Sequence, residues 1–101
     1  SAEVRAVGSV SAARIPLGLG LWYATKSETK ILGVAVDQFL RRSRIATRIV
    51  DAIEHWSTQS SRKRVTIGVA VEDVASCQMF KNRGWSCQFV DNRWHFEQRI
   101  G

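Results

Sequence analysis

An amphipathic helical segment with a short apolar run on each side is the pattern in this sequence that limits the fold most. Apolar side chains recur at helical spacing at Ile45, Ile49, Ala52, Ile53 and Trp56. This stripe predicts a helix with one buried face. The flanking runs, ILGVAV (31–36) and VTIGVAV (65–71), have the length and β-branched content of strands. We expect residues 65–71 to be a strand buried on both faces, with the helix laid on the same sheet.

Further period-two patterns predict strands on both sides of this central unit. Residues 17–25 (LGLGLWYAT) and 31–36 make a hairpin around the polar loop KSETK, and the first dozen residues fit an edge strand. Two runs flanking Asp91-Asn92 predict a final hairpin. The predicted order is therefore β-(β)-β-α-β-α-β-β, an α/β (α+β) fold with a mixed central sheet and helices packed on it.

A second, shorter helix is predicted between Asp73, which can cap its start, and Gly84, which suits its left-handed closing position. Its expected buried side holds Val74, Cys77 and Phe80.

The strand at residues 17–25 has two unlike sides. One side carries Leu17, Leu19, Leu21 and Tyr23, and we expect these side chains to pack in the core. Gly18 and Gly20 leave the other side bare, so that another element can pack closely on it.

Size and composition exclude several classes of protein. The 101 residues are 45% hydrophobic and 24% charged, which indicates a single folded domain over residues 1–101 and not a disordered chain. No apolar run approaches the ~20 residues of a membrane span, and the N-terminus lacks the apolar core of a signal peptide. Two cysteines are too few for a disulfide scaffold, so we expect a cytoplasmic protein. The chain begins at Ser1 without Met, as a processed chain or a piece truncated at the N-terminus would.

Positive charge is concentrated in one quarter of the chain. Residues 41–64 hold seven Arg and Lys against two acidic residues, which accounts for +5 of the net +6. Such a concentration indicates a polyanionic partner (nucleic acid, a nucleotide cofactor or an acidic protein) or a solvated basic helix face.

The arginine-rich turn between the strand at 31–36 and the central helix narrows this choice. Arg41, Arg42 and Arg44 stand where the helix begins, with Ser43 as a candidate cap. A helix N-terminus offers unpaired N–H groups and about half a positive charge, which suit a phosphate. We therefore expect a pyrophosphate at the amides of residues 43–47, held also by the arginines. The separate cluster Arg62-Lys63-Arg64 lies at the opposite end of the helix and cannot reach the same pyrophosphate.

Two motifs in register resemble the GCN5-related N-acetyltransferase (GNAT) superfamily. The acetyl-CoA signature [Q/R]-x-x-G-x-[G/A] after a strand is matched by Arg41 and Ala46 of RRSRIA (41–46). A second element, N-x-x-A-x-x-x-Y-x-x-x-G-F, is echoed by DVASCQMFKNRGW (73–85). The chain thus looks like a short, divergent member with a mostly antiparallel, GNAT-like acyl-CoA acyltransferase fold that lacks the usual N-terminal strand and helices.

The resemblance implies an acetyl-CoA-dependent N-acetyltransferase that transfers an acetyl group to an amine of a protein or small molecule. Its acyl-CoA (CoA) site would be formed by Val34, Ala35, Val36, Arg41, Arg42, Ser43, Arg44, Ile45, Ala46, Thr47, Asp73 and Phe80. Main-chain N–H groups of Val34–Val36 would bind the pantetheine arm and polarise the thioester carbonyl.

Two departures from the family pattern bear on activity. Arg44 replaces the first glycine of the turn, and Phe80 stands where the family has a tyrosine that protonates the leaving thiolate. The shortened N-terminal region leaves sheet edges exposed, so a homodimer formed through the sheet is expected.

Catalytic groups are not identifiable from the sequence. Glu72, which ends a strand, and Cys77, one helical turn before Phe80, are candidates for proton transfer, whereas His55 is expected to have a surface or structural role. Cys and His spacing fits no metal motif, so no metal is expected. Two alternatives to the enzyme stay open: a catalytically degenerate GNAT-like binding or assembly module, and a basic nucleic-acid-binding domain.

Overall fold

The computed structural model of the protein describes residues 3–10, 16–37 and 44–101. The order of elements within these residues is the predicted one. The elements are β1 (Glu3–Val10), β2 (Pro16–Ala24), β3 (Glu28–Val36), α1 (Ile45–Gln59), β4 (Arg64–Ala70), α2 (Val74–Asn82), β5 (Ser86–Val90) and β6 (Arg93–Arg99). Neither helix has the length and hydropathy needed to span a membrane.

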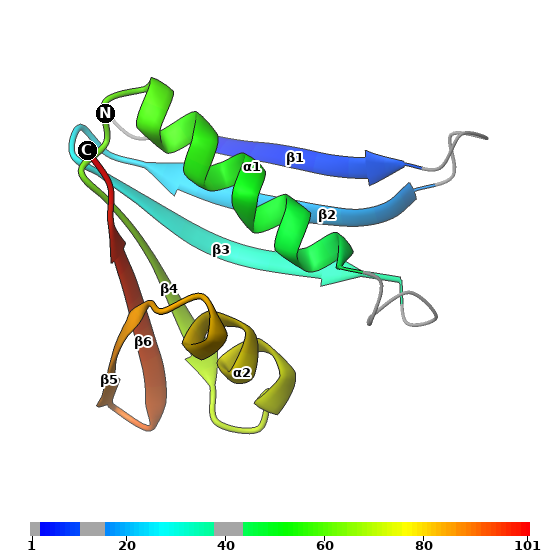
Figure 1. The fold of residues 1–101 in the computed structure, drawn as a ribbon, viewed down its shortest axis with the longest axis vertical. Helices are drawn as coiled ribbons and strands as arrows, with labels where there is room; N and C mark the ends of the chain where they lie inside the picture. Colours follow the sequence, from blue (N-terminus) through cyan, green and yellow to red (C-terminus); the bar gives the residue numbers. More distant parts are fainter. Residues whose placement is uncertain (1–2, 11–15, 38–43) are drawn as a thin grey trace.

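The strands form one sheet in the order β1-β2-β3-β4-β6-β5. Every neighbouring pair is antiparallel except β3 and β4, which are joined in parallel by the α1 crossover. Their pairing covers only Glu28–Ile31 against Arg64–Ile67. Beyond Ile31 and Ile67 the two strands diverge, and Figure 1 shows the resulting V between them. The mixed, mostly antiparallel sheet predicted from the sequence is confirmed.

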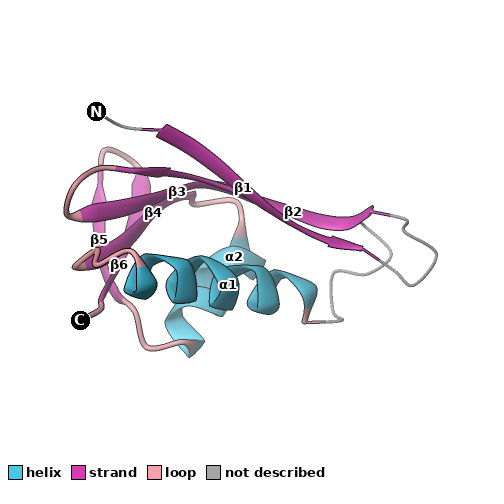
Figure 2. Cartoon of the chain, turned by 90° about the horizontal axis from the view of Figure 1, so that it is seen from above, coloured by secondary structure: helices cyan, strands magenta, loops and turns pink. Residues whose placement is uncertain are grey.

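Both helices lie on the same face of the sheet, as Figure 2 shows. α1 packs across β1, β2 and β3, whereas α2 lies beside β4 and β6 (Figure 1). The opposite face of the sheet, which we call the open face, carries neither of these helices.

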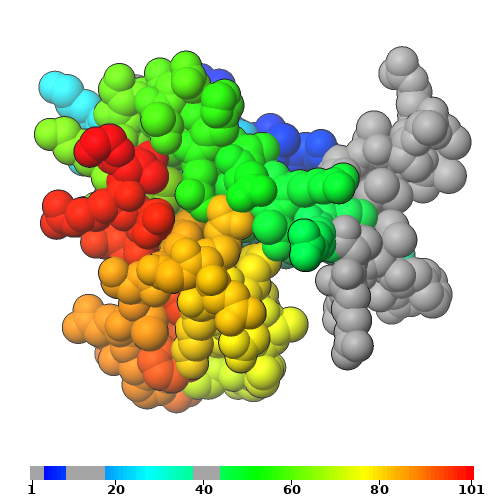
Figure 3. Space-filling model, in the orientation of Figure 1, coloured from blue at the N-terminus to red at the C-terminus, as the bar shows by residue number. Residues whose placement is uncertain are grey.

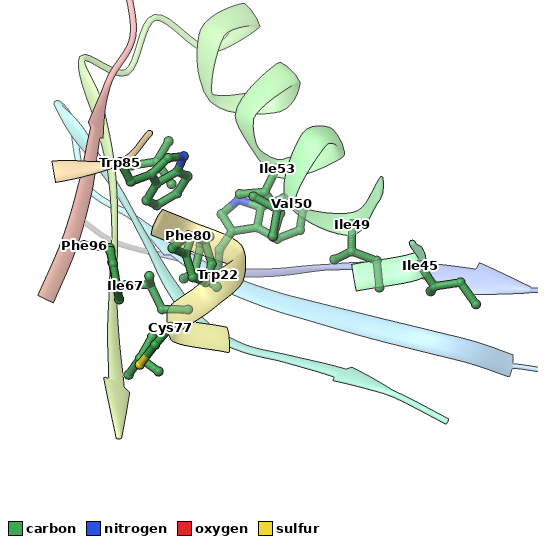
Figure 4. Packing of buried hydrophobic residues seen from close by; sticks show 13 residues of the cluster. Trp22, Ile45, Ile49, Val50, Ile53, Ile67, Cys77, Phe80, Trp85 and Phe96 are labelled. Atoms are coloured by element: carbon green, nitrogen blue, oxygen red, sulfur yellow. The ribbon is translucent and has the colours of Figure 1, made fainter. Parts of the chain in front are cut away.

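The core lies between the two helices and the sheet. Phe80 of α2 is its centre, with ring centroids 4.7 Å from Trp85 and 5.5 Å from Phe96 (Figure 4). The buried cluster consists of Trp22, Ile31, Ile45, Ile49, Val50, Ile53, Val65, Ile67, Val69, Cys77, Phe80, Trp85 and Phe96. Because this cluster draws on both helices and four of the strands, one core unites the described residues.

The bare glycine side of β2 is the side on which α1 packs. A Cβ built on Gly20 would lie 2.4 Å from Cγ2 of Ile49, and one on Gly18 would lie 3.0 Å from Ile45 and Ile49. The prediction of close packing there is confirmed.

The leucine side of β2 therefore lies on the open face, and the prediction that it packs in the core is wrong. Leu19, Leu21 and Tyr23 are 45%, 37% and 37% exposed, whereas Trp22 on the glycine side is only 4% exposed. A helix can approach a sheet closely only where no Cβ intervenes, so the glycines decide which side is covered.

Two further burial predictions need correction. β4 is buried on one face only, through Val65, Ile67 and Val69, because both helices lie on that face. Val74 is 70% exposed although Cys77 and Phe80 on the same helix are buried.

The predicted turn chemistry is confirmed. The Asp73 carboxylate accepts a hydrogen bond from the Ser76 N–H (3.1 Å) and caps α2. Gly84 (φ 79°), Asp91 (φ 51°) and Asn92 (φ 62°) adopt left-handed conformations, which close α2 and form the final hairpin turn. β1 is an edge strand, as expected.

Candidate functional site

A cavity of about 630 Å³ lies where the end of β3 meets the starts of α1 and α2. We call it the helix-side cavity. It is lined by Val34, Ala35, Val36, Arg44, Ala46, Thr47, Asp73, Ala75, Ser76 and Met79. The structure thus brings together seven of the residues that the sequence resemblance placed around a cofactor. In Figure 3 the surfaces of α1 (green) and α2 (yellow) meet on this face of the molecule.

A second cavity, of about 260 Å³, occupies the gap between β3 and β4 where their pairing has ended. We call it the passage. It reaches Gly68 and Arg93. The residues that it shares with the helix-side cavity are Val34, Ala46, Asp73, Ser76 and Met79. Arg93 pairs with Ala70 at the start of β6, and its Nη2 donates a hydrogen bond to the Gly68 carbonyl (3.1 Å). The passage therefore extends from the helices through the plane of the sheet.

The start of α1 has features that suit an anion. Arg44 is the N-cap residue, in a left-handed conformation (φ 67°, ψ 13°), and its own side chain forms no cap hydrogen bond within the described residues. The first turn of α1 also contains no acidic residue. Its N–H groups can therefore bind a phosphate, with the helix dipole adding partial positive charge. The predicted cap Ser43, together with Arg41 and Arg42, lies outside the described residues, and the N-cap is Arg44.

Two of the predicted cofactor residues, Ile45 and Phe80, do not line the helix-side cavity. Ile45 is buried in the core, so only its main chain can contribute to a ligand site. Phe80 lines the passage although it is almost fully buried, packed on Trp85 and Phe96. A phenyl ring at this place fills volume and has no proton to give.

The two catalytic candidates do not line the helix-side cavity or the passage. The Cys77 thiol is buried and lies 3.8 Å from the Ala70 carbonyl oxygen, as a small core residue would. Glu72 is exposed in the turn after β4. Neither is therefore placed by the structure to exchange a proton in the passage.

The basic cluster at the far end of α1 is engaged in structural contacts. The Arg62 guanidinium lies over the Trp56 ring (5.2 Å) and donates to the Ser60 carbonyl (2.7 Å). Arg64 forms an ion pair with Glu28 (3.0 Å). Like the predicted helix geometry, these contacts separate the cluster from the start of α1.

Arg83, just after α2, links the two helices beside the helix-side cavity. It donates to carboxylates of Asp51 (2.8 Å) and Glu54 on α1. Burial alone would lower the pKa of Arg83, but the hydrogen bonds to Glu54 and Asp51 outweigh it and raise that pKa above its ordinary value. Sequence reasoning missed this residue, as it missed Gly68 and Arg93, because no local pattern marks a contact between distant segments.

Comparisons with known proteins agree with this geometry. The model of the Acetyltransferase (GNAT) family matches residues 2–85. No curated protein sequence matches the chain.

Solved structures with the same fold are similar over almost the whole chain. A presumed acyl-CoA N-acyltransferase from Klebsiella pneumoniae has a TM-score of 0.90 at 13% identity, over 97% of this chain and 73% of its own. An acetyltransferase from Bacillus cereus has a TM-score of 0.85 at 13% identity, over 98% of this chain and 74% of its own. The PaiA N-acetyltransferase from Thermoplasma acidophilum, solved with coenzyme A, has a TM-score of 0.88 at 10% identity, over 96% of this chain and 61% of its own.

These likenesses establish the acyl-CoA N-acyltransferase fold, and the match over residues 2–85 covers most of the sequence. Acetyl-CoA is the acyl donor of the matched family. The chain belongs to the GNAT family of acetyltransferases.

Proposed function

We propose that the protein is an acetyl-CoA-dependent N-acetyltransferase, with residues 1–101 acting as one GNAT-like domain that acetylates a primary amine of a protein or small molecule. The observation that carries the proposal is the divergence of β3 from β4, which opens the passage beside the helix-side cavity. Acyl transfer needs a place where a donor held on one side can be reached from the other, and the passage supplies one.

The helix-side cavity would hold the donor. In this proposal the N–H groups of the first turn of α1 bind the pyrophosphate, helped by the Arg44 guanidinium. Arg41, Arg42 and Ser43, which precede Arg44 in the sequence, are proposed to contribute as well. Val34–Val36 offer main-chain groups along the edge of β3 that β4 leaves unpaired. Such an edge can bind the amide-rich pantetheine arm as an added strand would. The coenzyme A complex of the Thermoplasma acidophilum protein supports this choice of ligand.

Acetyl-CoA supplies an acyl thioester that an amine can attack. The N–H groups of β3 at the passage would polarise its carbonyl, a contribution worth about 3–4 kcal/mol per donor in other acyl-transfer enzymes. Phe80 cannot protonate the leaving thiolate, but the Arg93 guanidinium lines the same passage and places a positive charge there. We propose that Arg93 stabilises the thiolate by charge until solvent protonates it.

The absence of a proton donor at Phe80 also favours a second candidate function. In this candidate the protein is a degenerate module that binds acyl-CoA without turnover. A thiol-release assay with acetyl-CoA and a panel of primary amines separates the two functions. Release that depends on the amine supports the enzyme, whereas coenzyme A binding without release supports the module.

Binding to the helix-side cavity is tested by Ala46→Glu. Coenzyme A at about 100 times its Kd stabilises the native state by about 2.7 kcal/mol, a rise of roughly 10 °C in Tm for a domain of this size. A glutamate at residue 46 both fills the cavity and repels phosphate, so we expect the rise to disappear. Differential scanning fluorimetry with and without coenzyme A measures it.

The matched control is His55→Glu, which introduces the same charge on the same helix at an exposed residue outside the cavity. This variant should keep the rise in Tm. A wild-type protein whose Tm does not respond to millimolar coenzyme A would rule out the proposed function.

A further inference from the structure

The open face of the sheet carries a third cavity, which the donor site does not use. This open-face cavity measures about 510 Å³. Its charged and titratable side chains come from four strands and are Glu28, Lys30, Arg64, Cys87, His95 and Glu97. The cavity lies on the side of the sheet opposite α1 and α2, because Arg64, His95 and Glu97 alternate with the buried residues Val65 and Phe96.

The open-face cavity meets the passage at Ile67 and Gly68. These two residues line both cavities, and Ile67 is the last β4 residue paired with β3. Gly68 puts no side chain between the cavities. A Cβ built there would lie 3.5 Å from Nε of Arg93 and 3.8 Å from Cε1 of His95. A group that emerges from the passage beside Gly68 therefore comes within reach of the His95 imidazole.

His95 is a titratable group at this junction whose side chain has no structural partner among the described residues. It lies directly opposite Gly68 in the pairing of β4 with β6, and no hydrogen bond or ion pair within the described residues holds its imidazole. By contrast, Glu28 accepts hydrogen bonds from Arg64 (3.0 Å) and Thr66 (2.8 Å). Glu97 lies 3.6 Å from Arg64.

The charged groups around His95 come from three strands. Arg93 and Glu97 lie on either side of it on β6, and Arg64 projects from β4. β3 contributes Glu28 and Lys30 to the cavity wall, and β5 presents the neutral Gln88 directly opposite His95. Two carboxylates and two cations make this wall nearly neutral overall, and the carboxylate oxygens offer hydrogen-bond acceptors to a primary ammonium.

We propose that the open-face cavity binds the primary amine acceptor and that His95 takes a proton from the acceptor nitrogen. This inference rests on the proposed function, because it needs an acyl donor in the passage. A neutral imidazole has one ring nitrogen free to accept a proton, so it can act as the base toward an ammonium. His95 would thus be a catalytic residue on β6, one strand away from the passage.

The proposed step transfers the acetyl group from sulfur to nitrogen. His95 accepts one proton from the ammonium, and the freed electron pair of the nitrogen forms the N–C bond with the thioester carbonyl carbon. The C–S bond breaks and its electron pair leaves on sulfur. The nitrogen loses its second proton, the thiolate takes up one from solvent, and one proton is released overall.

The test compares His95→Gln with the wild type in a thiol-release assay across about pH 6 to 9. General base catalysis typically contributes 10²–10⁴-fold, so we expect kcat/KM to fall by about 100-fold or more at neutral pH. The deficit should shrink at high pH, where more of the acceptor is already deprotonated. The rise in Tm with coenzyme A should be unchanged, because His95 does not line the helix-side cavity.

His55→Gln is the matched control, since His55 is exposed on α1 away from all three cavities. It should show the wild-type rate and pH profile. A second variant, Gly68→Val, places a branched side chain at the junction of the passage and the open-face cavity. It should reduce turnover while leaving coenzyme A binding intact.

The outcomes separate this inference from the proposed function. No Tm response of the wild type to coenzyme A would refute the proposed function itself. A His95→Gln variant with the wild-type rate and pH profile would overturn the role of His95 while the donor site stands. Coenzyme A binding without thiol release from any primary amine would likewise overturn the inference.

Discussion

At the scale of single residues, Arg44 combines backbone strain with a positive charge at the helix-side cavity. Its left-handed conformation costs a non-glycine residue about 1–2 kcal/mol, and it stands where the resembled signature has a glycine. The start of α1 thus keeps a left-handed backbone conformation, although arginine adopts it less easily than the glycine of the signature. The guanidinium, meanwhile, lines the helix-side cavity beside the open first turn of α1.

Arg44→Gly should therefore change the stability of the protein and its affinity for coenzyme A in opposite directions. We expect the free energy of unfolding to rise by about 1 kcal/mol as the strain is relieved, while coenzyme A binds several-fold more weakly and with less dependence on salt. Urea denaturation and calorimetric titration measure the two effects. Arg44→Ala, the control, keeps the strain and should lose affinity without gaining stability. Wild-type affinity in both variants would exclude Arg44 from the pyrophosphate site.

At the scale of elements, the contact between β2 and α1 positions one wall of the helix-side cavity. Because Gly18 and Gly20 have no side chains, α1 can lie close to β2, with Ile45 and Ile49 directly on the strand. This close contact holds the start of α1, and with it Arg44, beside the end of β3. Gly18 and Gly20 thus influence the shape of the helix-side cavity indirectly, because they determine where α1 lies.

Gly20→Ala should disturb this contact. Its Cβ would lie 2.4 Å from Cγ2 of Ile49, so α1 must shift, and we expect a loss of about 1–3 kcal/mol in the free energy of unfolding. Gly33→Ala on β3 is the control, because a Cβ there meets no atom within 4 Å. Chemical denaturation of both variants tests the idea, and equal stabilities would show that α1 does not depend on the bare side of β2.

At the scale of the whole molecule, the V between β3 and β4 divides the protein into two parts. β1, β2 and β3 carry α1, and β4, β6 and β5 carry α2 (Figure 1). Besides the shared core, the connections between the parts include the short parallel pairing, the hydrogen bonds from Arg64 and Thr66 to Glu28, and Arg83, which reaches from the end of α2 to α1. The edges of the sheet are β1 and β5, and dimerisation through the sheet stays a prediction.

Arg83→Gln should weaken the connection between the parts. Glu54 is partly buried, and leaving its carboxylate without the guanidinium is expected to cost about 1–3 kcal/mol of unfolding free energy. Arg48→Gln, which neutralises an exposed arginine on α1 without removing such a link, should change stability by less than about 0.5 kcal/mol. Similar urea midpoints for the two variants would contradict a bridging role for Arg83.

The sequence by itself determined the order of the elements, the hairpin at Asp91-Asn92, the cap at Asp73 and the closing glycine at residue 84. It also made it predictable that Val34–Val36 and Arg44–Thr47 lie near one another, since they are close in sequence at the end of β3 and the start of α1. Over a short stretch of chain, residues near in sequence are near in space, and local propensities and spacing are enough to predict them.

Only the tertiary structure decided which side of β2 is buried, where β3 and β4 diverge, and that Gly68 faces His95. Alternation along a strand defines two sides, but which side is buried depends on the element that packs there. In β2, α1 packs on the side of Gly18 and Gly20, where no side chain keeps it away. The junction at Gly68 depends on pairing between strands distant in the sequence. Contacts of that kind arise from packing of the whole chain, because no local energy term specifies the register between strands so far apart.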